Sequence, residues 1–343
     1  MVGVAVVGAG YWGPNLVRNV QATPQFTLKA LCDLDEARAQ KVLGAYSTVR
    51  ATSNLAEVLA DPEVQAVAVA TPAATHLEVA MAALEAGKHV LVEKPLASSY
   101  ADGLKLVTAA EERGLVLMLD HTFCYTPVVR RLRELVHTGE LGDIQYFDSV
   151  RINLGLVQPD IDVLWDLAPH DLSILDSILP PDVTPVAVAA HGSDPAGLGR
   201  ACVAYISVRL SNGAIAHAHV NWLSPTKIRT TIVGGSRRTA VWNDLDPTQP
   251  LAVYDRGVDW PDGQEEQRRV SYRIGDMVAP ALPAGEALRG VMAEFAAAIE
   301  EGRPALTDGR SGLRVLAQLE AASASLAAGG TFVPVTDVNG GVR

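Results

Sequence analysis

The sequence predicts an α/β fold in two domains. The N-terminal domain is expected to have a parallel sheet with helices on both faces, and the second to be α+β with a large, mostly antiparallel open sheet. Three observations support this: a length of 343 residues, enough for about two domains; strand–helix alternation over the first 120 residues; and successive strand-like runs later, joined by hairpin turns such as Ser211-Asn212-Gly213. We place the domains at 1–121 and 122–343.

The N-terminal domain begins with a strand over 2–7, rich in β-branched residues and followed by a glycine turn. Further strands are expected at short apolar runs, most of them without polar alternation, which is typical of strands buried on both faces: 27–32, 66–70, 89–92 and 115–119. The expected helices lie between these strands: 14–20, 35–43, 53–59, 75–86 and 98–112.

The second domain is expected to contain helices over 127–137 and 169–179, ending at Gly139 and at Pro180-Pro181. Its expected strands are 144–153, 183–190, 201–210, 214–222 and 227–234. Two helices close the chain, over 286–301 and 308–328. The region 247–287 is rich in Pro, Gly and charge, and the pattern assigns it no element.

Composition excludes several classes of partner. The net charge of −11 repels a phosphate backbone and no basic stripe is present, so nucleic acid is not an expected partner. The longest apolar runs are too short to span a bilayer and the N-terminus lacks signal-peptide features, so we expect a cytoplasmic protein without a membrane partner. Cys32, Cys124 and Cys202 are widely spaced, which argues against a disulfide framework or a metal site.

The run Gly8-Ala9-Gly10-Tyr11-Trp12-Gly13 stands between a predicted strand and a predicted helix, the context that a dinucleotide-binding (Rossmann) turn requires. Gly8 permits the tight turn, Gly10 lets the pyrophosphate approach the backbone, and Gly13 allows close helix–strand packing. The helix N-terminus offers N–H groups to the phosphates. We expect Tyr11 and Trp12, within this turn, to contact the cofactor; the alternative is a purely structural turn.

Asp33 ends the second strand, twenty residues after Gly13. A carboxylate there binds both ribose hydroxyls of NAD and repels the 2′-phosphate of NADP, so NAD is the expected cofactor. The alternative is that Asp33 caps the following helix. Arg38, one turn further on, can meet a 2′-phosphate, so NADP stays open.

Glu93-Lys94-Pro95 follows the apolar strand 89–92. Because the carboxyl ends of parallel strands line the ligand crevice, Lys94 is expected at the nicotinamide end of the cofactor. Pro95 restricts the backbone of Lys94, and the bond between them can be cis. Position alone also fits a solvated surface lysine.

Asp166 and His170 are four residues apart. If the segment is helical they share a face and can bind a common ligand. Pro169 suits a helix start, and histidine exchanges a proton near neutral pH. The spacing also fits a capping aspartate beside a structural histidine.

Together these residues resemble the glucose–fructose oxidoreductase, inositol dehydrogenase and rhizopine-catabolism (Gfo/Idh/MocA) oxidoreductase family. The resemblance covers most of the chain and rests on the glycine turn, on 71–76, on 87–95 and on Asp166-x-x-x-His170. It implies that Lys94 and His170 act on the substrate hydroxyl. It also implies four residues that line the cofactor crevice: Thr71, Pro72, His76 and Glu93.

The chain departs from the family's frequent Gly-x-Asn-x-Arg-Phe pattern, reading Asp120-His121-Thr122-Phe123-Cys124-Tyr125 instead. Thr122 takes the Asn position, where its hydroxyl can hydrogen-bond the nicotinamide carboxamide. Cys124 takes the Arg position, so other side chains must meet the polar groups of the substrate. The candidates are Tyr125, Arg151, Asn153 and Trp165.

The expected reaction moves a hydride between NAD and a secondary alcohol or ketone. His170 is the expected proton acceptor, Asp166 orients the substrate or the imidazole, and Lys94 stabilises alkoxide character. The roles of Lys94 and His170 can be exchanged, because a desolvated lysine can titrate well below its reference pKa.

The resemblance implies a sugar, sugar derivative or cyclitol as substrate. The runs 151–156 and 165–171 resemble members found in nucleotide-sugar pathways, with C3 as the expected reacting carbon. The alternatives are an inositol dehydrogenase, an NAD-dependent glycoside-cleaving enzyme, a reductase of another compound class and a non-catalytic sensor. One face of the second sheet is expected to form a homodimer or homotetramer; a solvated face is the alternative.

Overall fold

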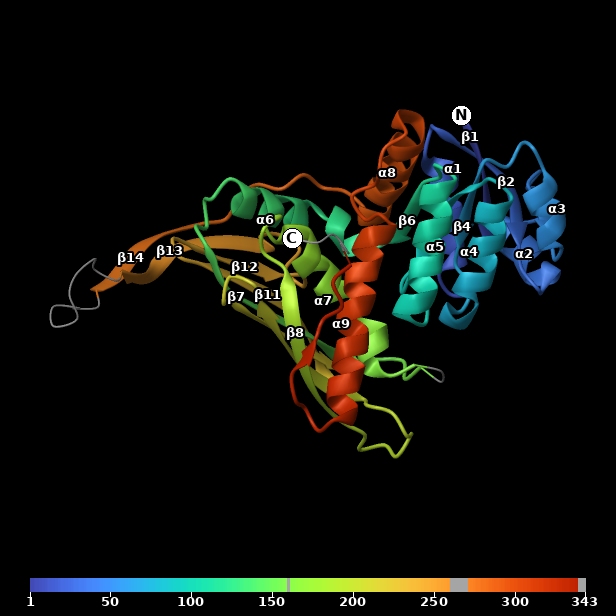
Figure 1. Ribbon diagram of the computed structural model, residues 1–343. Helices are drawn as coiled ribbons and strands as arrows, with labels where there is room; N and C mark the ends of the chain where they lie inside the picture. The colour runs from blue at the N-terminus through green and yellow to red at the C-terminus, as the bar shows by residue number, and fades with distance from the viewer. Residues whose placement is uncertain (159–160, 260–270, 339–343) are drawn as a thin grey trace. The chain divides into compact units, whose positions relative to one another are not determined.

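The computed structural model describes residues 1–158, 161–259 and 271–338. The chain forms two compact units (Figure 1). Unit 1 contains Met1–Thr126, Gly285–Ala317 and the described residues from Asp337; unit 2 contains Pro127–Ala284 and Gln318–Thr336. The two units therefore differ from a single division of the chain at 121/122, because residues 285–317 belong to unit 1.

Unit 1 has a six-stranded sheet in the order β3-β2-β1-β4-β5-β6, and every neighbouring pair is parallel. Its strands are β1 (Val2–Val7), β2 (Phe26–Cys32), β3 (Arg50–Thr52), β4 (Ala66–Val69), β5 (His89–Glu93) and β6 (Leu117–Asp120). This order is that of a Rossmann fold, and it reverses direction between β1 and β4. Ligands of such sheets bind at that switch point, beyond the carboxyl ends of the strands; we call this side the carboxyl edge.

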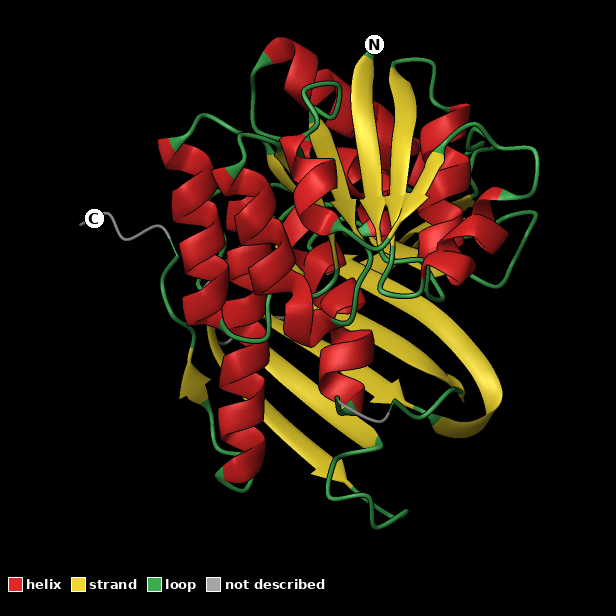
Figure 2. Ribbon diagram, turned by 90° about the vertical axis from the view of Figure 1, so that its right-hand side faces the viewer, coloured by secondary structure: helices red, strands yellow, loops and turns green. Residues whose placement is uncertain are grey.

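Helices lie on both sides of the parallel strands (Figure 2). They are α1 (Gly13–Ala22), α2 (Glu36–Leu43), α3 (Leu55–Ala60), α4 (His76–Glu85), α5 (Tyr100–Glu112) and α8 (Ala287–Glu301), with 3-10 turns η1 (Ala73–Thr75) and η2 (Thr122–Tyr125). In one core cluster, Leu16 of α1 and Phe295 of α8 pack with Val4 and Val6 of β1. Because a buried side chain of this size contributes roughly 1.5–3 kcal/mol, α8 is an integral part of the nucleotide-binding unit.

Unit 2 has a nine-stranded sheet in the order β14-β13-β12-β11-β7-β10-β9-β8-β15. Its strands are β7 (Ile144–Leu154), β8 (Pro185–Ser193), β9 (Val203–Leu210), β10 (Ile215–Asn221), β11 (Leu223–Gly235), β12 (Thr239–Asn243), β13 (Leu251–Asp259), β14 (Ser271–Val278) and β15 (Val333–Pro334). Among the described strands of unit 2, only the β7–β10 pair is parallel. The prediction of a mostly antiparallel sheet is confirmed, and its long strands lie side by side in Figure 2.

Three helices complete the fold: α6 (Pro127–His137), α7 (Val163–Ile178) and α9 (Gly309–Ala327), which begins in unit 1 and ends in unit 2. The predicted start of α7 at residue 169 is wrong. Asp162 caps the helix by accepting a hydrogen bond from the Trp165 N–H at 3.0 Å, so the helix begins at Val163 and Pro169 lies inside it. A stronger cap seven residues upstream thus overrides the proline signal.

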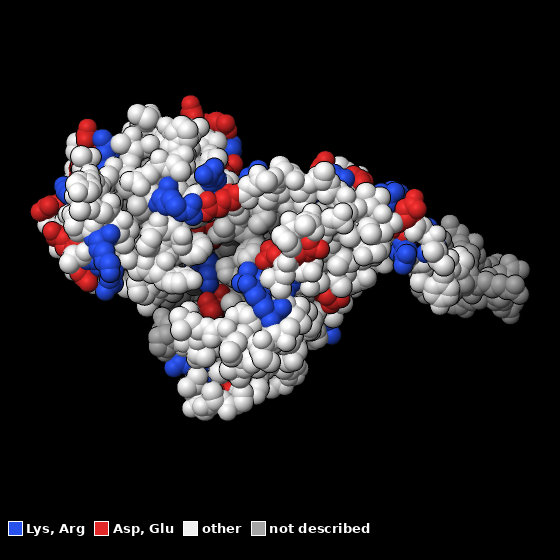
Figure 3. Space-filling model, turned by 180° about the vertical axis from the view of Figure 1, so that it is seen from behind, with Lys and Arg blue, Asp and Glu red and all other residues white. Residues whose placement is uncertain are grey.

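The surface carries charges of both signs. On the face in Figure 3, Lys and Arg side chains lie among Asp and Glu rather than in one continuous stripe. Within the described ranges, no helix is both long and apolar enough to cross a membrane.

Candidate active site

The glycine turn of unit 1 links β1 to α1. Gly8 adopts a φ of +105°, which L side chains rarely adopt, and a Cβ on Gly13 would collide with the Gly8 carbonyl oxygen. A Cβ on Gly10 would meet nothing within 4 Å. The turn therefore requires Gly8 and Gly13 for its own geometry, whereas the space at Gly10 is open to a ligand.

The N-terminus of α1 suits an anion. Its N-cap residue, Trp12, makes no side-chain capping bond, Pro14 lies in the first turn, and no acidic residue is present there. Pro14 has no N–H and the Asn15 N–H donates to the Trp12 carbonyl oxygen at 2.9 Å, so it is chiefly the positive end of the helix dipole that favours a phosphate at this terminus. With the open space at Gly10, these residues fit the pyrophosphate of a dinucleotide.

Asp33 lies beside the glycine turn just beyond β2. Its carboxylate accepts hydrogen bonds from the Ala9 N–H at 2.6 Å and the Asp35 N–H at 2.9 Å, and its side chain is only 10% exposed. Asp35, not Asp33, caps α2, so the capping alternative for Asp33 is wrong. Arg38 approaches Asp33 to 3.7 Å. Backbone N–H groups thus hold Asp33 at the carboxyl edge, and its carboxylate does not cap a helix.

Lys94 follows β5 directly, and its peptide bond to Pro95 is cis. Glu93 at the end of β5 is in register with Asp120 at the end of β6. The Asp120 carboxylate accepts hydrogen bonds from the Thr122 hydroxyl at 2.7 Å and from the Trp12 indole N–H at 3.2 Å. Charged and polar groups of three segments therefore meet at the carboxyl edge.

Two histidines of this region are buried. The ring of His76 is 1% exposed, with its nitrogens 2.7 Å from the Pro95 carbonyl oxygen and 2.9 Å from that of Thr71. Burial lowers the pKa of His76. Because both ring nitrogens face carbonyl oxygens, His76 joins the loop at Thr71 and Pro72 to the Lys94–Pro95 turn, and no ring nitrogen is left for a ligand.

His121 is 2% exposed, and neither ring nitrogen has a hydrogen-bond partner among the described residues. Burial, together with the positive charge of Lys94, lowers the pKa of His121 to about 3. The ring is therefore neutral at physiological pH. Tyr11, by contrast, points into solvent with 93% of its surface exposed.

In unit 2, Asp166 and His170 lie four residues apart on α7, as the helical interpretation of their spacing requires. The Asp166 carboxylate accepts a hydrogen bond from the indole N–H of Trp222 at 3.0 Å, and Trp222 is 1% exposed. This bond fixes Asp166 from the sheet side. His170 is half-buried.

Arg151, a predicted substrate residue, lies inside unit 2. Its guanidinium is 5% exposed and forms two hydrogen bonds with Asp171, at 2.9 and 3.0 Å, and Ser149 donates to the same carboxylate at 2.7 Å. The Trp165 indole N–H likewise donates to Ser323 at 2.9 Å. Arg151 and Trp165 therefore form hydrogen bonds to other side chains of unit 2. Asn153 lies half-buried on β7.

Tyr125 belongs to the core of unit 1 rather than to an open surface. It is 3% exposed, and its hydroxyl lies 2.8 Å from the hydroxyl of Thr307, which donates to the Leu119 carbonyl at 2.7 Å. Burial raises the pKa of Tyr125. The prediction of Tyr125 as a substrate residue is therefore corrected to a packing role. The sequence cannot show this contact, because Thr307 is distant along the chain.

Sequence reasoning missed Asp120, His121 and Trp222. The signal for Asp120 was present, since a carboxylate ends an apolar strand beside the one ending in Glu93. His121 follows directly, and its burial was not visible in the pattern. Trp222 closes a strand of alternating burial, and only the packing of α7 reveals its bond to Asp166.

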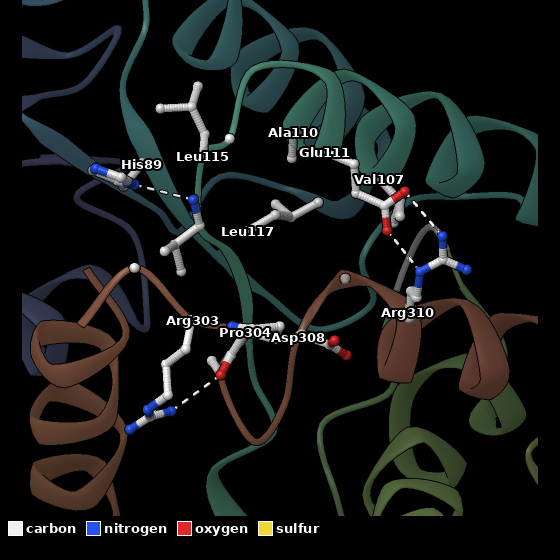
Figure 4. A pocket seen from close by; sticks show the side chains of 15 residues that line it. His89, Val107, Ala110, Glu111, Leu115, Leu117, Arg303, Pro304, Asp308 and Arg310 are labelled. Carbon is white, nitrogen blue, oxygen red and sulfur yellow. Dashed lines mark hydrogen bonds and ion pairs between the residues drawn. The ribbon is translucent and has the colours of Figure 1, made fainter. Parts of the chain in front are cut away.

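A separate cavity of about 220 Å³ lies at the amino ends of β5 and β6, opposite the carboxyl edge (Figure 4). Its charged side chains are committed to partners: Arg310 pairs with Glu111 at 2.6 Å and Arg303 with Glu294 at 2.6 Å. His89 accepts a hydrogen bond from the Val116 N–H at 3.0 Å. Two of its arginines, Arg303 and Arg310, are therefore already paired with carboxylates.

Two family descriptions match the chain. Residues 2–121 match the GFO/IDH/MocA oxidoreductase family, described as an NAD-binding Rossmann fold, and residues 129–240 match the GFO/IDH/MocA C-terminal domain. The UDP-N-acetylglucosamine 3-dehydrogenase of Acidithiobacillus ferrooxidans is 32% identical over 318 residues, covering 91% of this chain and 93% of that protein. The uncharacterized oxidoreductase YrbE of Bacillus subtilis is 27% identical over 219 residues, covering 62% of this chain and 64% of that protein.

Solved structures agree with these matches. That of the Acidithiobacillus dehydrogenase superimposes with a TM-score of 0.81 at 29% identity, covering 96% of this chain and 99% of the other. The structure of GenD2 from gentamicin A biosynthesis, in complex with NAD, superimposes with a TM-score of 0.81 at 27% identity, covering 98% and 97%.

Proposed function

The chain belongs to the GFO/IDH/MocA family of NAD-binding oxidoreductases, and we propose that it oxidises a secondary alcohol of a nucleotide sugar at C3. The observation that carries this proposal is Lys94, at the end of β5 on the edge that also presents the glycine turn and Asp33. The nucleotide-sugar assignment is supported by the 32% identity to a UDP-N-acetylglucosamine 3-dehydrogenase.

Each part of NAD has residues suited to hold it. The positive end of the α1 dipole and the open space at Gly10 suit the pyrophosphate, and the Asp33 carboxylate suits the ribose hydroxyls. The polar groups that follow β5 and β6 suit the nicotinamide end. When bound, the nicotinamide accepts the hydride that leaves the alcohol carbon.

The chain's own residues handle the proton. We propose that His170 accepts the hydroxyl proton and that Asp166, fixed by Trp222, orients the imidazole or the sugar. Lys94 donates a hydrogen bond to the same oxygen and stabilises its developing negative charge.

Replacement of the two proton-handling residues tests this function. Lys94→Ala and His170→Ala should each lower kcat by at least about a hundredfold, the usual size of an acid–base contribution, while the Kd for NAD changes little. Turnover is followed by NADH absorbance, and cofactor affinity by calorimetry. Near wild-type turnover in both variants contradicts the assignment.

We further propose that the chain forms a homodimer or homotetramer through the sheet of unit 2. In β9 and β10 alternate residues are buried, and α7 contacts both strands. The intervening residues include Tyr205, 46% exposed, and Ile215, 48% exposed, and the Tyr205 ring stacks on His219 with centroids 4.3 Å apart. The same face carries Ser207, Arg209, His217 and His219, so Tyr205 and Ile215 are the large exposed side chains that a partner would bury there.

Size-exclusion chromatography with light scattering checks this assembly. The double variant Tyr205→Glu/Ile215→Glu should run as a monomer, because it buries two charges in the interface. Leu104→Glu, which changes a residue 44% exposed on α5 of unit 1, is the control and should leave the mass unchanged. An oligomer of unchanged mass in the double variant, or a monomeric wild type, contradicts the assignment.

A further inference from the structure

Two carboxyl groups lie side by side at the carboxyl edge of unit 1. Glu93 ends β5, Asp120 ends β6, and the two are register partners on adjacent parallel strands. Asp120 is 1% exposed, and the outer oxygen Oε1 of Glu93 is buried. Two ionised carboxylates in so small a water-poor space repel strongly, so one of them is expected to hold a proton.

Hydrogen bonding shows which carboxyl holds it. Both oxygens of Asp120 already accept hydrogen bonds, from Thr122 at 2.7 Å and from Trp12 at 3.2 Å, so Asp120 acts as the acceptor of the pair. Glu93 accepts one bond, from the Lys94 N–H to Oε2 at 3.2 Å. Its Oε1 has no hydrogen-bond partner among the described residues. A proton on Glu93 gives that buried oxygen a partner in Asp120.

We propose that Glu93 and Asp120 share one proton at neutral pH, and that this pair fixes Thr122 as the hydrogen-bond acceptor for the carboxamide NH2 of nicotinamide. The second half of this inference rests on the proposed cofactor site; the first half concerns the protein alone. Glu93 and Asp120 are positioning residues, because they act through Thr122 and Trp12.

The role of Thr122 follows from its single hydroxyl proton. The hydroxyl donates to Asp120, so only its lone pairs remain for a ligand. The carboxamide of nicotinamide offers an NH2 donor, which a lone-pair acceptor can bind. Asp120 therefore determines that Thr122 accepts rather than donates toward the cofactor.

The surrounding charges are consistent with one shared proton. Burial raises the pKa of Glu93 well above its ordinary value, and the negative charge of Asp120 raises it further, whereas Lys94 opposes the shift. His121 is neutral, because burial and Lys94 lower its pKa. With Glu93 protonated, the charge of Asp120 is balanced by that of Lys94.

Infrared spectroscopy of the cofactor-free protein tests the shared proton. At pH 7 the wild type should show the carbonyl stretch of a buried protonated carboxyl, and Glu93→Gln should lose it. Glu85→Gln, which replaces an exposed glutamate at the end of α4, is the matched control and should keep the band. Identical carboxyl bands in the wild type and Glu93→Gln overturn the proposal.

Cofactor analogues test the role of Thr122. The 3-acetylpyridine analogue of NAD carries a methyl group in place of the carboxamide NH2. By calorimetry the wild type should bind NAD roughly threefold to tenfold more tightly than the analogue, the value of one hydrogen bond. The ratio should fall to about one in Thr122→Val and in Asp120→Asn, which frees the threonine hydroxyl to rotate.

Glu93→Gln should preserve this ratio, because its amide N–H replaces the carboxyl O–H toward Asp120. An unchanged ratio in Thr122→Val overturns the role of Thr122. Equal binding of NAD and the analogue by the wild type also overturns it, but leaves the proposed function intact. Failure of the wild type to bind either dinucleotide overturns both, while the infrared result still decides the shared proton.

Discussion

Asp33 combines two tasks in one side chain. It accepts hydrogen bonds from the glycine turn and from its own loop, so its orientation is fixed before any ligand arrives. A carboxylate held there accepts from ribose hydroxyls and repels a 2′-phosphate. Arg38, 3.7 Å away, is the nearby cation that a 2′-phosphate would meet if Asp33 were neutral.

Asp33→Ala should weaken NAD binding by about tenfold or more, because hydrogen bonds to a charged group are worth roughly 1.5–3 kcal/mol. The affinity for NADP should rise, since the repelling charge is gone and Arg38 keeps only Asp35, at 3.5 Å, as a carboxylate partner. Calorimetric Kd values for both cofactors give the ratio. Asp35→Ala is the control, because it removes one negative charge and the cap of α2. This variant should keep the wild-type preference for NAD over NADP. If Asp33→Ala also keeps the preference for NAD over NADP, Asp33 does not bind the ribose hydroxyls.

Residues at strand ends were predictable from the sequence, and residues with distant partners were not. The pattern placed Lys94 and Asp33 at the carboxyl edge because apolar runs end immediately before them. It did not reveal the partner of Arg151, which is Asp171 on α7, or that of Tyr125, which is Thr307. Such partners depend on how elements pack, and single-sequence periodicity carries no record of it.

Among the structural elements, the glycine turn contains glycines that packing requires and a glycine that only a ligand requires. Gly13 is required for packing, since a Cβ there would meet the Gly8 carbonyl, whereas Gly10 faces open space. The fold therefore needs Gly8 and Gly13, whereas it tolerates a change at Gly10. The requirement at Gly10 comes from the ligand alone.

Alanine substitutions should separate these requirements. Gly10→Ala should change the Tm by less than about 2 °C but weaken NAD binding by at least about tenfold, because its methyl group enters the pyrophosphate space. Gly13→Ala should lower stability by about 1–3 kcal/mol, the cost of overpacking. Thermal unfolding and calorimetry measure both. Wild-type NAD affinity in Gly10→Ala would show that the phosphates bind elsewhere.

Other elements were harder to predict. The strands β12, β13 and β14 lie in or near the stretch to which the pattern assigned no structure, and much of β14 is exposed. Edge strands of an open sheet bury little apolar surface, so their sequences lack clear alternation. Residues 260–270 of that stretch lie outside the described residues.

For the whole molecule, the sequence predicted both sheets but not the path of the chain between them. Residues 285–317 return to unit 1, where Phe295 packs against Phe26 of β2 with ring centroids 6.0 Å apart. A helix distant in the sequence therefore completes the core of the nucleotide-binding unit. An amphipathic helix does not by itself specify which sheet it covers.

The net charge of −11 bears on the substrate. An acidic molecule gains nothing from long-range attraction of an anionic nucleotide sugar, so binding must rely on local donors. The measured association rate should therefore rise with ionic strength, because salt screens the repulsion between the acidic protein and an anionic substrate.

An isotope experiment tests the proposed hydride transfer from C3 of a nucleotide sugar to NAD. The protein is incubated with NAD and UDP-N-acetylglucosamine carrying deuterium at C3, and the cofactor is analysed by mass spectrometry. We expect reduced NAD that contains one deuterium, in amount equal to the 3-keto sugar formed. Reduced cofactor without deuterium contradicts oxidation at C3, and cleavage of the sugar with no net reduction of NAD contradicts dehydrogenation itself.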